Sequence, residues 1–156
     1  MARVFRSPLV IAVLTWLSFS YSAEAQTQQP FNGSIASATL KVNVGNCFEE
    51  EDFRAAGSGD PLGQFSAVGH QFVSYCAPPG DPDIEGDVTF MDENGDELSI
   101  HYTGSRLDPA AFLCDMSATG GTGRYDGASV TATLLIDNYD LDHPFDGTFD
   151  GTIIIP

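Results

Sequence analysis

Hydrophobic and polar residues alternate with a period of two along most of the chain. Leu98, Ile100 and Tyr102, for example, are separated by the polar residues Ser99 and His101. This alternation is the pattern of a strand with one buried face, and no comparable helical stripe follows the first 25 residues. The chain is therefore predicted to be all-β. The same criterion predicts strands near residues 35–44, 65–75, 84–91, 97–103, 112–118, 129–136 and 145–155.

Only residues 47–57, CFEEEDFRAAG, suggest a helix, of one or two turns. Short strands joined by turns are typical of a barrel or a sandwich. A closed up-and-down barrel usually has an even number of strands, so we expect one more strand within residues 46–64. The predicted fold is a single antiparallel β-barrel of about eight strands, calycin-like in outline and formed by residues 26–156.

The predicted turns and bends agree with a closed barrel. Asn94-Gly95 lies between two alternating runs and is the strongest short signal for a hairpin with a tight type I′ turn. The tetrapeptide FDGT occurs twice, at residues 145–148 and 149–152. It places aromatic rings and glycines on one strand face, where bare backbone lets a sheet bend sharply.

The first 25 residues are typical of a secretory signal peptide. Arg3 and Arg6 precede the apolar run Pro8–Leu17, which is too short to cross a bilayer as a helix, and Ala23-Glu24-Ala25 fits a cleavage site. An uncleaved anchor is the alternative. We expect cleavage after Ala25 and a secreted or periplasmic protein whose mature chain does not insert into the membrane.

The chain is strongly acidic, with 22 Asp and Glu against six Lys and Arg and a net charge of −16. Such a surface repels nucleic acid, so no nucleic-acid partner is expected. Asp137, Asp140 and Asp142 share one loop and could bind calcium, although acidic loops are usually only solvated. No other cofactor is expected.

Three cysteines allow one disulfide and leave one thiol, and export makes a bridge plausible. Three pairings of Cys47, Cys76 and Cys114 are open. We favour Cys76 with Cys114, because both border predicted strands.

The glycine-rich stretch from Ser117 to Ser129 could bind a phosphate or turn the chain. No lysine follows its glycines, as a P-loop requires, and a dinucleotide fingerprint would need glycine where Asp126 stands. A strand pattern follows it instead of a helix. We therefore interpret it as a structural turn, with Gly120, Gly121 and Gly123 providing positive φ and close packing, and with Arg124 and Tyr125 holding the turn to neighbouring strands.

His70 is the one candidate for a catalytic side chain. It shares a strand face with Val68 and Phe72, which we expect to point into the barrel. A polar group there could orient a ligand, and a hydrogen-bonded structural histidine is the alternative.

Three motifs in order resemble the allene oxide cyclase barrel-like group, which includes the plant dirigent proteins and many small secreted bacterial proteins of unknown function. The resemblance covers roughly residues 31–155, and Ser129 replaces a glycine of the late turn. The matching residues are Leu62, Gly63 and Phe65, then Asn94, Gly95, Asp96, Leu98, Tyr102 and Gly104, then Gly120, Gly121, Thr122, Gly123, Arg124, Tyr125 and Ala128.

The resemblance implies an eight-stranded barrel with an apolar interior, which in the plant proteins holds a fatty-acid-derived epoxide or orients phenoxy radicals. Their catalytic residues do not map onto this chain. Dimers or trimers are possible by analogy.

Three functions follow as hypotheses. The barrel could hold a small apolar ligand, or it could be filled and serve as an envelope or extracellular interaction module. As an enzyme it would be a cyclase or isomerase acting on an oxidised lipid, with His70 as first candidate. A ligand inside would contact Leu98, Ile100, Tyr102, Phe145 and Phe149.

Overall fold

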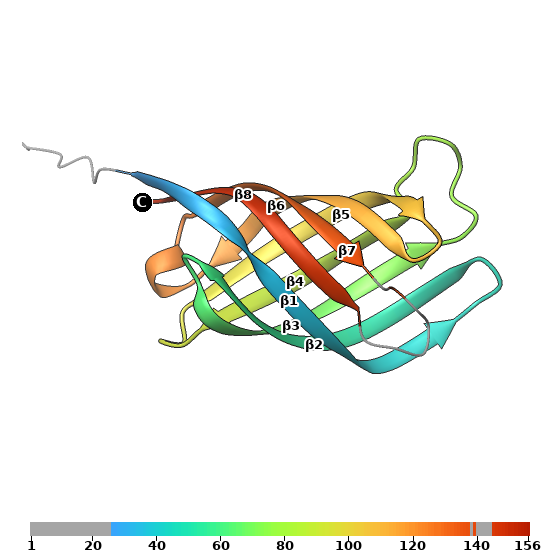
Figure 1. Cartoon of the computed structure of the whole chain (residues 1–156), viewed down its shortest axis with the longest axis horizontal. Helices are drawn as coiled ribbons and strands as arrows, with labels where there is room; N and C mark the ends of the chain where they lie inside the picture. The colour runs from blue at the N-terminus through green and yellow to red at the C-terminus, as the bar shows by residue number, and fades with distance from the viewer. Residues whose placement is uncertain (1–25, 138, 140–144) are drawn as a thin grey trace, which may run out of the picture.

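The computed structural model describes residues 26–137, 139 and 145–156, which form one closed barrel of eight strands (Figure 1). A single 3-10 turn, η1, is the one helical element among them. In chain order the elements are β1 (Thr27–Val44), β2 (Phe48–Asp60), β3 (Gly63–Ser74), β4 (Ile84–Asp92), β5 (Glu97–Asp108), β6 (Ala111–Gly121), η1 (Gly123–Tyr125), β7 (Ser129–Asp137) and β8 (Asp146–Ile155).

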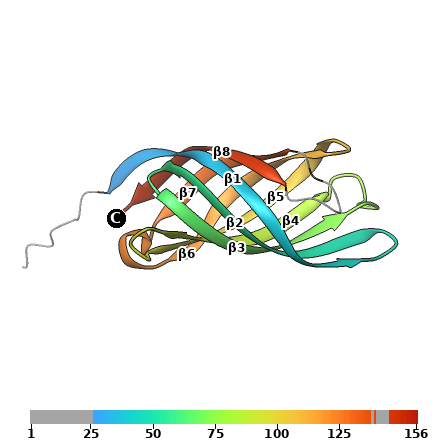
Figure 2. The ribbon, with the colours of Figure 1, turned by 60° about the horizontal axis from the view of Figure 1, so that its bottom comes forward.

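Every strand pairs antiparallel with its neighbours in sequence, and β1 pairs with β8 to close the barrel (Figure 2). Phe31 of β1 lies opposite Gly151 of β8 in this closing ladder. The predicted all-β, eight-stranded antiparallel barrel is confirmed. No helix in the described residues is long and apolar enough to span a bilayer. The predicted signal peptide, residues 1–25, lies outside the described part of the chain.

The two ends of the barrel differ. One end, which we call the terminal end, holds the C-terminus, the β4–β5 hairpin and η1 (Figure 1). The opposite end, which we call the disulfide end, holds the loop from β3 to β4 and the turns that follow β1 and β5.

The helix expected over residues 47–57 is wrong, because this segment is strand β2. Glu49, Glu51, Phe53 and Ala55 all point inward, with a period of two. Two of these inward residues are acidic, so a pattern of hydrophobic and polar residues does not reveal that inward and outward residues alternate. β2 is the eighth strand that barrel closure required.

The β4–β5 hairpin forms around Asn94-Gly95, but its loop spans residues 93–96 and is longer than the predicted type I′ turn. Asp92 accounts for the longer loop. Its Oδ1 accepts hydrogen bonds from the backbone N–H groups of Asn94 at 2.8 Å and Asp96 at 3.1 Å. These bonds satisfy backbone donors that a shorter turn would pair across the strands.

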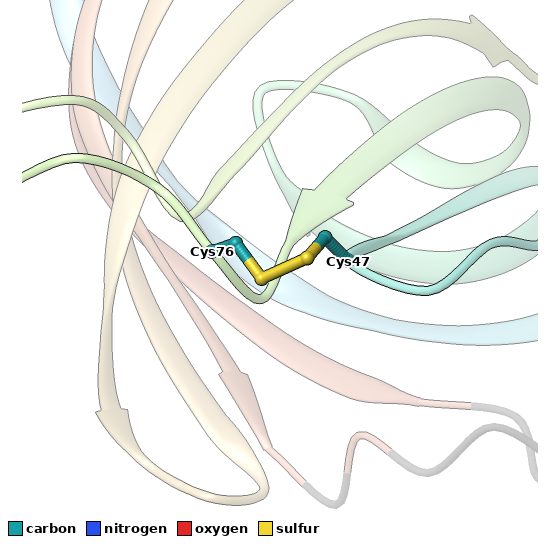
Figure 3. Close-up of a disulfide and its surroundings, with 2 residues drawn as sticks. All are labelled: Cys47 and Cys76. Atoms are coloured by element: carbon teal, nitrogen blue, oxygen red, sulfur yellow. A yellow bond between two sulfur atoms is a disulfide. The ribbon is translucent and has the colours of Figure 1, made fainter.

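The disulfide joins Cys47 to Cys76, so the predicted pairing of Cys76 with Cys114 is wrong. Figure 3 shows the bridge between the segment that enters β2 and the segment that leaves β3. Pairing of Phe48 with Ser74 brings these two segments together. Cys114 is a free thiol buried on β6, where it faces the barrel interior.

Candidate functional site

The interior of the barrel is filled by its own side chains. Phe31, Phe65, Phe90 and Phe149 form five ring pairs with centroids 4.7–6.4 Å apart, and all five pairs are tilted or edge-to-face. The five predicted ligand contacts, Leu98, Ile100, Tyr102, Phe145 and Phe149, all lie in this core. The void beside them measures about 10 Å³, close to the lower limit for one water molecule.

Polar side chains replace apolar ones inside the barrel toward the disulfide end. Glu51 of β2 faces Gln71 of β3, whose Nε2 donates to Glu51 Oε2 at 2.7 Å, and Tyr102 of β5 donates to Gln71 Oε1 at 2.8 Å. Thr39 of β1 donates to the other oxygen of Glu51. Gly86 of β4 lies between Gln71 of β3 and Tyr102 of β5 in the sheet. Its lack of a Cβ leaves room for the ring of Tyr102.

A second group of polar residues lies next to the disulfide. Tyr75, which precedes Cys76, donates to Glu49 Oε2 at 2.7 Å. The guanidinium of Arg106 stacks on two rings, 5.0 Å from the centroid of Tyr75 and 4.7 Å from that of Phe112. Tyr139 packs edge-on against the same Phe112 ring at 5.3 Å.

We call these seven residues the polar cluster: Glu49, Glu51, Gln71, Tyr75, Tyr102, Arg106 and Tyr139. Two buried atoms of the cluster, Arg106 Nη2 and the hydroxyl of Tyr139, form no hydrogen bond of good geometry with any described residue, although Glu49 lies near the Tyr139 hydroxyl. Buried polar groups without partners are rare in folded proteins and often mark a site for a ligand or water. The cluster is therefore the candidate functional site.

Burial raises the pKa of several side chains in the polar cluster. Burial raises the pKa of Glu51, although hydrogen bonds from Thr39 and Gln71 oppose the shift. Burial and the bond to Glu49 raise the pKa of Tyr75 to about 12. Burial and the nearby carboxylates of Glu49 and Glu51 also raise the pKa of Tyr139. At neutral pH these phenols are protonated and can donate hydrogen bonds.

The structure corrects the predicted position of His70, which lies on the outer surface of β3. Its Nδ1 is 2.8 Å from Asp52 Oδ1 and its Nε2 is 3.5 Å from Glu50 Oε1. The strand phase was misread because Val68 and Phe72 are apolar yet point outward with His70. Phe72 stacks there on Phe48 with centroids 5.6 Å apart.

The glycine-rich turn lies at the terminal end, far along the barrel from the polar cluster. Arg124 Nη2 contacts Asp92 Oδ2 at 2.7 Å and the carbonyl oxygen of Pro61 at 2.8 Å, and the hydroxyl of Tyr125 is 3.4 Å from Asp92 Oδ2. Only Gly123 of the three predicted glycines has positive φ, at 55°. Gly121 allows close approach to Tyr125, whereas Gly120 does neither, so its expected role is wrong.

The predicted calcium loop remains a prediction. Asp137 ends β7 and is exposed, while Asp140 and Asp142 lie outside the described residues. Within the described ranges, no group of three or more histidine, cysteine or acidic residues is arranged to hold a metal ion.

Sequence reasoning missed the polar cluster itself. Its members come from three strands and two connecting segments, so no local motif contains them. The available signal was the spacing of Glu49 and Glu51, which share the face of Phe53 and Ala55. Two acids on an inward strand face indicate a buried polar site.

Comparisons with known proteins support the fold. No family model matches the chain, and no curated protein is significantly similar in sequence. A solved pterocarpan synthase dirigent protein matches with a TM-score of 0.54 and 10% identity, over 98% of this chain and 99% of that one. Pyocyanin demethylase matches with a TM-score of 0.49 and 17% identity, over 78% of this chain and 99% of that one. The fold is a dirigent-like barrel.

Proposed function

We propose that the protein is an exported binding barrel that holds a small organic molecule against the polar cluster. The observation that carries this proposal is that two buried groups, Arg106 Nη2 and the Tyr139 hydroxyl, lack a hydrogen bond of good geometry to any described residue. A ligand that accepts hydrogen bonds from both would remove the cost of leaving them unsatisfied. The likeness to a dirigent protein supports a ligand-binding barrel at the level of the fold.

The filled interior excludes the centre of the barrel as the place where the ligand binds. A molecule of lipid size does not fit the 10 Å³ void among Tyr102, Phe145 and Phe149. The rings of Phe112 and Tyr75 beside Arg106 supply apolar contact at the disulfide end instead. The ligand therefore has an apolar body and a polar group that the cluster binds.

Export is supported by the signal-peptide pattern of residues 1–25 and by the Cys47–Cys76 bridge. Disulfides persist in oxidising compartments, and a bridge is rare in reducing ones. Growth of the host, followed by intact-mass analysis of the exported fraction, tests this part. We expect a chain that begins at Gln26.

Native mass spectrometry of the protein purified from its own host tests the binding function. We expect an additional mass of a small organic molecule on the wild-type protein. Arg106→Gln combined with Tyr139→Phe should lose that mass, and Arg54→Gln should keep it, because Arg54 is exposed on the outer face of β2. Retention of the same mass by the double variant would contradict the proposal.

The filled interior also favours a second function, an extracellular or envelope interaction module. The outer surface carries exposed apolar side chains such as Val68, which is 61% exposed, and Leu40, which is 56% exposed. This function predicts a bare polypeptide mass in the same spectrum.

A further inference from the structure

We infer that the loop between β3 and β4 forms a docking groove for an extended, basic segment of another protein. The inference rests on the second proposed function, an interaction module, and names the chemistry of its partner. It does not depend on the ligand of the polar cluster.

Two hollows on the outer surface of the barrel adjoin this loop, which stands out at the disulfide end (Figure 1). Their volumes are about 470 Å³ and about 260 Å³. Ala77, Pro78, Asp81 and Pro82 line both hollows, so the loop is a wall that the two hollows share. We call the two hollows together the loop groove.

The rest of the loop groove includes one cross-strand row of outward side chains. Phe72 of β3 pairs with Glu85 of β4, and both line the smaller hollow. Glu85 pairs in turn with Thr103 of β5, which pairs with Asp115 of β6. Thr103 and Asp115 line the larger hollow. Because neighbouring strands lie about 4.8 Å apart, the backbone positions of Glu85 and Asp115 are separated by about 10 Å across the row.

The loop groove carries negative charge without a balancing cation. Asp81 lines both hollows, and the exposed Glu85 and Asp115 line one each. Among the described residues, no lysine, arginine or histidine lines either hollow. The two histidines of the adjoining row each contact a carboxylate of their own. A partner with basic side chains is therefore complementary in charge to the groove.

The loop is held in place before any partner binds. The disulfide fixes its start at Cys76. At its end, the backbone N–H of Asp83 donates to the carbonyl oxygen of Gly104 at 2.9 Å, and Asp83 Oδ2 accepts from the backbone N–H of Arg106 at 2.9 Å. Three of the residues 77–82 are prolines, whose rings fix φ. A preformed surface of this kind loses little conformational entropy on binding.

Apolar rings beside the carboxylates favour a peptide over a simple cation. The side chains of Phe72, Pro78 and Pro82 line the smaller hollow and would pack on apolar residues of the partner. In the polyproline II conformation, side chains three residues apart share one face and are about 9 Å apart. This spacing matches that of Glu85 and Asp115. The partner is therefore an extended, proline-containing segment with two basic side chains three residues apart.

Titration of the isotope-labelled protein with capped peptides, followed in proton–nitrogen NMR spectra, tests this inference. The probe is a proline-rich peptide with arginines at its third and sixth positions. A peptide of the same composition with adjacent arginines and the polyamine spermine are the comparison ligands. We expect the probe to shift the backbone signals of Asp81, Glu85 and Thr103. It should bind about five-fold more tightly than either comparison ligand, which is the upper range for one exposed ion pair.

Variants assign the binding to the loop groove. Glu85→Gln and Asp115→Asn should each weaken binding of the probe about five-fold. Asp150→Asn is the matched control, because it removes an equal charge from an exposed position on the outer face of β8, and it should leave the affinity unchanged. All three positions are exposed, so each variant should fold.

Three results would overturn the inference. The first is no binding of the probe. The second is equal affinity for the probe and a comparison ligand, which would show that an acidic protein attracts any cation. The third is equal weakening by Glu85→Gln and Asp150→Asn.

The mass spectrum of the host-derived protein separates this inference from the proposed functions. A retained organic mass without binding of the probe would leave the binding barrel standing and remove the docking groove. A bare polypeptide mass without binding of the probe would leave the interaction module standing and remove only this partner.

Discussion

Arg124 reaches from η1 to the side chain of Asp92 at the end of β4, with Nη2 2.7 Å from Oδ2. The Arg124 side chain is 39% exposed, whereas the Asp92 side chain is completely shielded from solvent. Arg124 also donates to the carbonyl oxygen of Pro61, before β3. One side chain thus ties three connecting segments together across the terminal end of the barrel.

Loss of this contact should destabilise the barrel. Arg124→Gln leaves the buried Asp92 carboxylate without its cationic partner, which costs about 1–3 kcal/mol of unfolding free energy. Urea denaturation followed by tyrosine fluorescence measures the change. Arg54→Gln is the matched control, because it removes an equal charge from the exposed face of β2. Equal effects of the two substitutions would contradict the prediction.

Asp92 should also contribute to acid sensitivity. Burial pushes its pKa up, but hydrogen bonds from the backbone of Asn94 and Asp96, with the charge of Arg124, outweigh burial and hold the pKa below its ordinary value of 3.8. A lowered pKa stabilises the fold above the unfolded-state value, and this contribution is lost as pH falls through the lowered value. Stability should therefore fall below about pH 4. Asp92→Asn should make that fall shallower in unfolding curves measured from pH 6 to pH 2.

Two adjacent glycines should respond differently to alanine. A Cβ at Gly121 would lie 2.3 Å from the backbone oxygen of Tyr125, whereas a Cβ at Gly120 meets no atom within 4 Å. Gly121→Ala must displace the backbone of η1 and should lower the melting temperature by several degrees, since about 1 kcal/mol corresponds to ~4 °C in a chain of this size. Gly120→Ala should be neutral or slightly stabilising. Thermal unfolding by circular dichroism compares the two, and equal melting temperatures would argue against the close approach.

The sequence predicted the strands better than it predicted which face of each strand is buried. Period-two alternation located seven strands because each has one largely apolar face, although in β1 and β3 the alternating apolar residues include exposed ones such as Leu40 and Val68. β2 escaped this criterion because Glu49 and Glu51 point inward, and β3 was assigned the wrong inward face because Val68 and Phe72 are apolar on its outer face. Hydropathy does not distinguish an acidic residue that points into the barrel from one that points outward. The pairing register with neighbouring strands determines which face of a strand is buried.

The same limit applies to the polar cluster and the disulfide. Gln71 and Tyr102 are 31 residues apart and meet only because β3, β4 and β5 pair in register. Cys47 pairs with Cys76 because β2 and β3 are neighbours, whereas Cys114 lies inside the barrel. Long-range pairing of this kind leaves no local pattern in a single sequence.

The reactivity of the three cysteines should follow from the Cys47–Cys76 bridge and the buried position of Cys114. Burial, with the charge of Asp115, raises the pKa of Cys114 to about 12, so its thiol should not react with an alkylating reagent at neutral pH. We expect no label on the native protein and one label per chain after denaturation without reductant. Peptide mapping should recover a Cys47–Cys76 peptide, and recovery of a peptide that joins Cys76 to Cys114 would contradict the structure.

Removal of the disulfide should weaken the fold without abolishing it. The bridge closes a loop of 29 residues, which corresponds to about 3–4 kcal/mol in the chain-entropy model. The combined substitution Cys47→Ser with Cys76→Ser should lower the free energy of unfolding measured in urea by that amount. Strand pairing continues to Phe48 and Ser74 beside the bridge, so the far-ultraviolet spectrum should remain that of a barrel.

Ionisation of the buried Glu51 carboxyl group should destabilise the barrel as pH rises. Burial raises its pKa above 4.5, and hydrogen bonds from Thr39 and Gln71 offset only part of that shift. A carboxyl group with a raised pKa binds its proton more tightly in the folded state, so its contribution is full below the unfolded pKa and is lost as pH rises through the folded value. Glu51→Gln keeps the shape of the side chain and removes the ionisation. The stability of the wild type relative to this variant should therefore decrease from about pH 4.5 upward.

Glu50→Gln is the control for this trend, because Glu50 is the neighbouring acid on the outer face and its side chain is 47% exposed. Urea midpoints of the three proteins, measured at intervals from pH 4 to pH 8, give the two difference curves. The difference curve for Glu51 should slope downward as pH rises, and the curve for Glu50 shows what removal of an exposed acid does in the same pH range. A flat curve for Glu51 would mean that its carboxylate ionises inside the barrel at no cost, and that the hydrogen bonds from Thr39 and Gln71 fully replace the water it has lost.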